Sequence, residues 1–306
     1  MMVNGEVVED AMPDNKAPFA VQEANGVRSG PVRYPTNFSK ASKGSIHDDE
    51  RARELGFRGG TVAGNIHFEQ FPPLLEAVLG AEWRRNGNLS LYFLNPTSDM
   101  EPVQAFVGAP EPRQEGGLRA KVWMETPQGV RVCEGTAAVG PPDMDSELRN
   151  RVKAARPATD LRILASSKVG DRVTDIPSRQ ESEKTSPRVE NITEALDIYT
   201  DAAILGGLVA APSAAIDALR PVEGPLFNAN GEFVGMFGAI ELQFLKGPIF
   251  IDRDYLCDAE ILALSESPKT ETAWFESTLR TADGGEPIAK MIMLTRLLKG
   301  SSPLWG

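Results

Sequence analysis

The chain has 306 residues, of which 41% are hydrophobic and 25% are charged, so it is long enough for two domains and can bury a substantial core. Its 32 basic and 43 acidic side chains give a net charge of −11 at pH 7, which disfavours nucleic acid and anionic membrane as general partners. No apolar run approaches the roughly 18 residues that a membrane-spanning helix needs. Residues 1–16 are polar and acidic, unlike a secretory signal, so we expect a cytoplasmic protein.

The first half of the chain predicts one long helix followed by four strands. The apolar segment 64–80 is typical of a buried helix, although Pro72 and Pro73 predict a kink or a restart within it. Apolar and polar residues then alternate over 89–94, as in a half-buried strand. Three further strands follow within 102–140, with a turn at 127–129.

The second half repeats this order. The apolar segment 201–220 predicts a helix, the alternating segment 240–245 a strand, and residues 255–298 three more strands that turn at 283–285. The two alternating segments begin at Leu89 and Ile240, an offset of 151 positions, close to half the chain. The repeat indicates two α+β units, each a helix on a curved antiparallel sheet. The alternative is that both halves merely share common strand patterns.

The boundary between the units is expected near 141–160, after Gly140-Pro141-Pro142, which gives domains 1–150 and 151–306. Residues 176–190 are polar enough to predict an exposed loop. The two cysteines, Cys133 and Cys257, lie far apart and are expected to be buried, reduced thiols.

The candidate site lies in the first half, which contains both histidines, His47 and His67. Histidine is the side chain best suited to moving protons near neutral pH. Ser45 is a candidate N-cap for a short helix over 48–55, with Asp48 completing a capping box, so that His47 would lie at its start. A glycine-rich turn then leads to the start of the long helix, where free N–H groups favour negative charge.

This stretch resembles the signature of the (R)-specific enoyl-CoA hydratases, the MaoC-like proteins of the hotdog fold. The residues that match in order and nearly in spacing are His47, Ala52, Gly56-Phe57 and Gly64. The two-unit layout is similar to the fused double-hotdog members of the family. The resemblance implies a tandem hotdog fold whose second unit, without a histidine, is a scaffold or an acyl-binding wall.

The resemblance also implies a mechanism. In the family, an Asp and a His hold a water and add it across the double bond of an acyl thioester, while an N–H at the helix start polarises the thioester carbonyl. Here His47 would be the acid–base residue and the Gly64 N–H the carbonyl donor. Ser42 stands where the family has its catalytic Asp, and residues 38–46 contain no carboxylate. Ser42 could orient a water but could not act as a base.

Three of the remaining candidate residues each have a functional and a structural interpretation. His67 either enters the same cavity as His47 or is a satisfied core histidine. Asp48 either replaces the missing base or only caps a helix, and Arg58 either neutralises a phosphate of coenzyme A or belongs to an ordinary charged face. The same stretch supplies the other candidate substrate contacts, Phe57, Gly60 and Asn65.

Other chemistries lack their motifs. The sequence contains no Walker loop, no GxGxxG after a strand, no HExxH, no CxxC pair and no GxSxG elbow. We therefore expect no metal and no cofactor. The leading function is a hydratase or dehydratase in fatty acid or polyketide metabolism, acting on a 2-enoyl or 3-hydroxyacyl thioester of coenzyme A or a carrier protein. The alternatives are an acyl-CoA thioesterase and a non-catalytic acyl-thioester-binding protein, and a homodimer stays open.

Overall fold

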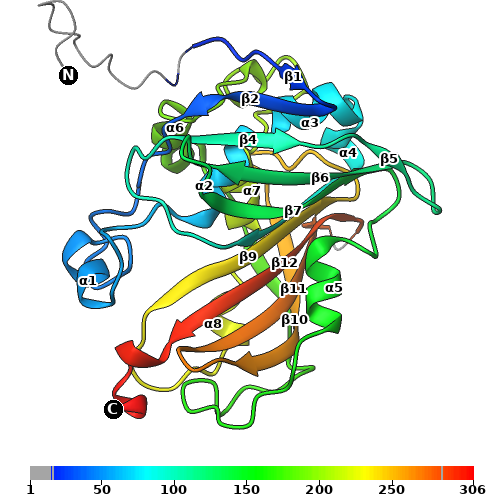
Figure 1. Ribbon diagram of the computed structural model, residues 1–306. Coiled ribbons are helices and arrows are strands. Elements are labelled where there is room, and N and C mark those ends of the chain that lie inside the picture. The colour runs from blue at the N-terminus through cyan, green and yellow to red at the C-terminus, as the bar shows by residue number, and fades with distance from the viewer. Residues whose placement is uncertain (1–14, 16, 284) are drawn as a thin grey trace, which may run out of the picture.

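The computed structural model describes residue 15, residues 17–283 and residues 285–306 (Figure 1). The polar N-terminal stretch, apart from Asn15 and Ala17 onward, lies outside this part of the chain. Within the described residues, no helix has the length and apolar character needed to cross a membrane.

The strands of both halves form one antiparallel sheet in the order β1-β2-β4-β6-β7-β3-β9-β12-β11-β10-β8, with β5 paired to β6 (Figure 1). Those of the first half are β1 (Gln22–Ala24), β2 (Val27–Arg33), β3 (Gly87–Phe93), β4 (Val103–Val107), β5 (Glu111–Pro112), β6 (Leu118–Glu125) and β7 (Arg131–Val139). Those of the second half are β8 (Arg172–Ser178), β9 (Gly235–Phe244), β10 (Tyr255–Glu266), β11 (Thr270–Thr281) and β12 (Pro287–Leu298).

The strand order is symmetric about the pair β3–β9. Outward from this pair the first half runs β7, β6, β4, β2 and the second half runs β12, β11, β10, β8. Across the junction Leu89 faces Leu242 and Leu91 faces Ile240, so residues offset by 151 positions exchange places. The predicted repeat and the α+β class are therefore confirmed, and the two sheets are one continuous sheet.

Helices cover both faces of this sheet. The first half contributes α1 (Asp49–Glu54), α2 (Gly64–His67), η1 (Phe68–Gln70), α3 (Pro72–Leu79) and α4 (Trp83–Asn86). Along the rest of the chain come α5 (Glu147–Lys153), α6 (Ser182–Val189), η2 (Asp197–Tyr199), α7 (Pro212–Ala218), α8 (Glu223–Leu226), η3 (Lys299–Ser301) and η4 (Pro303–Trp305). α2 and α7 contact each other, while α5 packs across the junction of β3 and β9 (Figure 1).

The central helix of the first half breaks where the prolines predict it. α2 passes into the 3₁₀ turn η1, and α3 restarts with Pro72 as its first residue, where a missing N–H breaks no helical bond. The side chains of Phe68, Phe71 and Leu75 are fully buried against the sheet.

Two predictions of secondary structure were wrong. Only 212–218 of the predicted helix 201–220 is helical, because Pro212 can start a helix but cannot continue one. Residues 201–206 are exposed instead, among them Ile204 and Leu205. The predicted exposed loop 176–190 instead contains the end of β8 and helix α6, whose Thr185 is buried.

The junction of the two halves can be tested with Leu91→Ala. Leu91 is fully buried in β3 opposite Ile240, so we expect the substitution to lower the free energy of unfolding by about 2–5 kcal/mol, through lost burial and the cavity left behind. Urea denaturation measures this change. Val130→Ala, at a half-exposed turn position, is the matched control and should change stability by less than about 0.5 kcal/mol.

Candidate functional site

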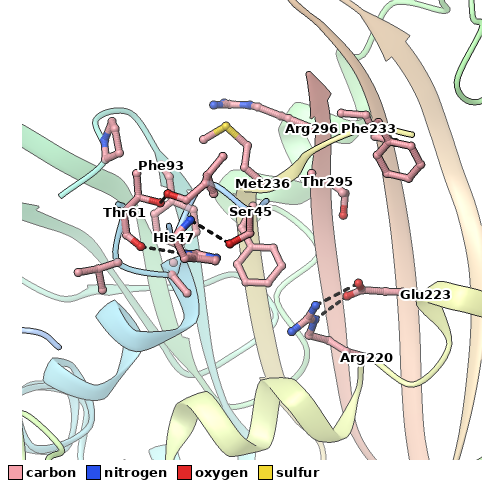
Figure 2. A pocket seen from close by; sticks show the side chains of 18 of the residues that line it. Ser45, His47, Thr61, Phe93, Arg220, Glu223, Phe233, Met236, Thr295 and Arg296 are labelled. Atoms are coloured by element: carbon pink, nitrogen blue, oxygen red, sulfur yellow. Dashed lines mark hydrogen bonds and ion pairs between the residues drawn. The ribbon is translucent and has the colours of Figure 1, made fainter. Parts of the chain in front are cut away.

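A cavity of about 470 Å³ lies where the two halves meet. The first half contributes the loop that carries Ser45–His47, the start of α2 and the end of β3. The second half contributes the α7–α8 connection and parts of β9 and β12. Figure 2 shows His47 on one side of the drawn group and the Arg220–Glu223 pair on another. The cavity therefore needs both halves of the chain.

His47 lines this cavity with its tautomer set by the backbone. Its Nδ1 lies 2.6 Å from the carbonyl oxygen of Thr61. Because a carbonyl can only accept, Nδ1 carries the proton and Nε2 is left with a free lone pair. Burial lowers the pKa of His47, the Thr61 hydrogen bond partly opposes this, and the positive charge of Arg220 lowers it further. At neutral pH the ring is therefore an uncharged base.

Close backbone packing holds His47 in place. A Cβ on Gly60 would lie 2.3 Å from the carbonyl oxygen of His47, so only glycine allows the two segments to pass. Asn37 Nδ2 donates to the same oxygen at 2.9 Å, and Asp49 Oδ1 accepts from the Gly60 N–H at 2.7 Å. The loop is thus fixed independently of any ligand.

The predicted capping box was wrong in detail. The N-cap of α1 is Asp48, which accepts from the Glu50 N–H at 3.4 Å. The Ser45 hydroxyl instead donates to the Ser42 carbonyl oxygen at 2.7 Å and accepts from the His47 N–H at 3.2 Å. Ser45 therefore orders the loop directly before His47, and its side chain lines the cavity.

The start of α2 also borders the cavity. A Cβ on Gly64 would lie 2.5 Å from a ring carbon of Phe93, so glycine is needed for this approach. Gly64 is the first residue of α2, where an N–H has no helical acceptor, and no other acceptor is found for it among the described residues. This N–H is available to a carbonyl oxygen in the cavity.

His67 lines the same cavity as His47, but as a core histidine it is only half satisfied, because its buried Nδ1 has no hydrogen-bond partner among the described residues. It is only 2% exposed, and its Nε2 lies 3.0 Å from the Thr97 hydroxyl. Burial lowers the pKa of His67 to about 4, so the ring is neutral at physiological pH. It forms a polar, uncharged part of the wall of the cavity that His47 also lines.

The other candidate residues lie outside the lining of the cavity. Ser42 is exposed, Asp48 caps α1, and neither faces the cavity. Arg58 pairs with Glu101 at 2.8 Å and donates to the carbonyl oxygen of Pro96, a lining residue, at 3.2 Å. The remaining three, Phe57, Gly60 and Asn65, support the loop and the helix packing rather than the wall.

The residues that the second half contributes to the cavity wall were not predicted from the sequence. Arg220 binds Glu223 through two hydrogen bonds of 2.6 and 3.1 Å, and it also donates to Asp217 at 3.1 Å. Glu223 is the one carboxylate on the cavity wall within the part of the chain that the structure describes. The only sequence signal was the Arg220–Glu223 spacing of three, which is typical of any exposed helix. The apolar wall of the second half comes from Phe227, Phe233, Met236 and Phe237.

Neither thiol offers a nucleophile at this site. Cys133 and Cys257 are buried and lie outside the cavity, and burial raises the pKa of both, that of Cys257 to about 12. Among the described residues, no three His, Cys, Asp or Glu side chains gather into a metal site.

Comparison of the sequence with protein-family models and with curated proteins gave no match. Solved structures do match. A protein from Chloroflexus aurantiacus, described as a MaoC domain dehydratase, has a TM-score of 0.63 at 11% identity and covers 92% of this chain and 94% of its own. A MaoC-like dehydratase gives 0.53 at 14% identity, covering 92% and 97%. A conserved hypothetical protein from Mycobacterium tuberculosis with a double hotdog fold gives 0.54 at 10% identity, covering 88% and 94%.

The fold is a double hotdog. The similarity extends over nearly the whole chain in each case, and the predicted tandem hotdog architecture is confirmed. At such low identity the similarity establishes the fold, and the activity has to be argued from the site.

The neutral state of His67 makes a testable contribution to stability. An unfolded histidine binds a proton near pH 6.5 but folded His67 only near pH 4, so acid favours the unfolded chain. Between pH 7.5 and pH 5 this should cost the wild type about 2 kcal/mol relative to His67→Gln. Urea denaturation of both proteins at the two pH values measures the difference. An unchanged difference would show that His67 is protonated as easily in the folded protein as in the unfolded one.

Proposed function

We propose that the protein catalyses the reversible hydration of a 2-enoyl thioester, with His47 as the acid–base residue. The observation that carries this proposal is the position of His47, whose free Nε2 borders the same cavity as the unpaired N–H of Gly64. A base and a carbonyl donor on one apolar cavity are what addition of water to a conjugated thioester needs.

In the proposed step His47 Nε2 accepts a proton from a water molecule while the water oxygen bonds to C3 of the enoyl group. The electrons of the C2–C3 double bond move toward the thioester carbonyl, and the Gly64 N–H stabilises the negative charge that develops on its oxygen. The proton on Nε2 then passes to C2, giving the 3-hydroxyacyl thioester and restoring neutral His47. Dehydration is the reverse.

The cavity supports an acyl group as the substrate. Its volume of about 470 Å³ is within the range of small-molecule sites, and aromatic and aliphatic side chains form most of its wall. In the proposal the acyl group lies against Phe227 and Phe237. Arg58 and Arg296, near the rim and on the wall, are the candidates to meet the phosphates of coenzyme A or the linker of a carrier protein.

One feature weakens the proposed activity. Among the described lining residues, the first half contributes no carboxylate, and Glu223, on the second half, is held by Arg220. Loss of one acid–base partner typically costs about 10² to 10⁴ in rate. We therefore expect slow hydration, and the same observation favours a second candidate function, binding of an acyl thioester without turnover.

The first experiment is mass spectrometry of 2-enoyl-CoA and 3-hydroxyacyl-CoA thioesters after incubation with the protein. We expect gain or loss of one water, and a decrease of about 10² to 10⁴ in His47→Ala because its base is removed. Val130→Ala, at an exposed turn outside the cavity, is the control and should keep the wild-type rate.

The other outcomes separate the alternatives. Free coenzyme A without a change in water would identify a thioesterase. Inert substrates that still bind, measured by calorimetry, would identify the non-catalytic function. Equal turnover by the wild type and His47→Ala would falsify the role proposed for His47.

The pH dependence of hydration follows from the lowered pKa of His47. The base must be neutral, so kcat/KM should stay flat from pH 8 to pH 7 and fall only as the pH drops below about 6.5, the ordinary value for histidine. A rate profile from pH 5 to pH 8.5 measures this. A midpoint at or above pH 7 would contradict the assignment of His47 as the buried base.

A further inference from the structure

A second cavity of about 260 Å³ borders the start of α7, which contacts α2. Its walls are α6, η2, the segment before α7 and the start of α7, together with Glu69 of the first half. Apolar side chains dominate its interior, among them Ile192, Val209 and Ile251. It shares no lining residue with the first cavity.

The two cavities occupy matching places in the two halves. α2 follows the N-cap Ala63 and α7 follows the N-cap Ala211, an offset of 148 positions. At the same offset, Asn65 corresponds to Ser213 and Glu69 to Asp217.

The hydrogen bonds between the helices obey this symmetry. Asn65 Nδ2 donates to Asp217 Oδ1 at 3.3 Å, and Ser213 Oγ donates to Glu69 Oε1 at 2.6 Å. Each half's helix start thus donates a hydrogen bond to a carboxylate of the other half, and in the second cavity both partners line the wall.

The second cavity is not a second copy of the first. Pro212 stands where the first half has Gly64, so no N–H is available at that helical position. The second half also has no histidine. Carbonyl polarisation and proton transfer as proposed for the first cavity are therefore absent here.

Glu69 is the unusual group in this cavity. It is 1% exposed, and its Oε2 has no hydrogen-bond partner among the described residues, although such an atom ordinarily has one. Burial raises the pKa of Glu69 to about 8, against the opposing effects of the Ser213 hydrogen bond and the Arg188 charge. At pH 7 the carboxyl is protonated, and with Oε1 already accepting from Ser213, its O–H can donate.

Arg188, the one arginine or lysine on the wall of this cavity among the described residues, already has a carboxylate partner. Arg188 of α6 is in an ion pair with Asp217 of α7, which Arg220 also binds. Within the described lining of this cavity, no unpaired cation is therefore left to hold an anion beside Glu69. Tyr199 of η2 is buried in the same wall, and burial raises its pKa, so it is neutral as well.

We propose that the second cavity binds a small uncharged molecule with a carbonyl oxygen on a short apolar body, and that the Glu69 carboxyl donates a hydrogen bond to this oxygen. The apolar body lies against Ile192, Val209 and Ile251. The volume equals that of roughly eight or nine water molecules, which limits the ligand to a short chain.

Methyl NMR with hexanamide as the probe tests this binding. Ile192 and Ile251 line the second cavity and Ile46 lines the first, so their δ1-methyl signals report the two sites separately. We expect hexanamide to shift the signals of Ile192 and Ile251. The dissociation constant should rise about tenfold or more in Glu69→Leu, which removes the donor but keeps the volume. It should stay within about threefold in Glu69→Gln, whose amide can donate.

A second variant keeps the test valid if Glu69→Leu fails to fold. Ser186→Trp places a large ring at the exposed mouth of the cavity and leaves Glu69 intact, so it should abolish the shifts of Ile192 and Ile251. The proposal is overturned if Glu69→Leu binds as well as the wild type, if only Ile46 shifts, or if nothing shifts and the cavity holds water alone. None of these results depends on turnover at His47.

Discussion

The pairing of β3 with β9 is the constraint on which the rest of the molecule depends. It continues one sheet through both halves and places α2 against α7 on one face, while α5 closes the other. On the face that α5 covers, the Ser90 hydroxyl accepts a hydrogen bond from the Leu148 N–H at 3.0 Å, and buried Glu241 forms an ion pair with Arg149 at 3.4 Å. Because backbone pairing fixes the register, it also fixes which side chain of one half reaches the cavity of the other. The wall of the first cavity comes from both halves, and the second cavity takes Glu69 from the first half.

The same symmetry shows how far the two halves have diverged in chemistry. Asp217 is held in ion pairs by Arg188 and Arg220, whereas its counterpart Glu69 has no ion pair among the described residues and accepts a hydrogen bond from the Ser213 hydroxyl, and burial raises its pKa to about 8. At the equivalent helix positions, Gly64 has a backbone N–H that can donate to a carbonyl oxygen, whereas Pro212 has none. A fold built from two equivalent units therefore contains two different environments, one suited to moving a proton and one suited to donating a fixed hydrogen bond.

Much of the fold could be predicted from the sequence, because strand alternation is a local signal and the 151-residue repeat is seen by comparing the two halves. His47 and Gly64 were found through a motif. Arg220 and Glu223 could not be found, since their place on the same cavity as His47 depends on sheet register across the whole chain. The helix predicted over 201–220 was too long, because apolar composition alone does not distinguish a helix from an irregular segment. Ser and Asp are both favourable N-cap residues, so the sequence did not distinguish Ser45 from Asp48, which is the N-cap in the folded chain.

The environment of His47 affects the two proton transfers of the proposed hydration in opposite ways. The Thr61 carbonyl orients the ring as a carboxylate would, but it lacks the full negative charge that stabilises an imidazolium. Arg220 destabilises that cation further. Removing the proton from water is therefore harder, whereas returning it to C2 is easier, because a less stable imidazolium is the stronger acid. On this reasoning the addition of water limits the rate, and a carboxylate near Nε2 would relieve that limit more than any change to the acyl-binding wall.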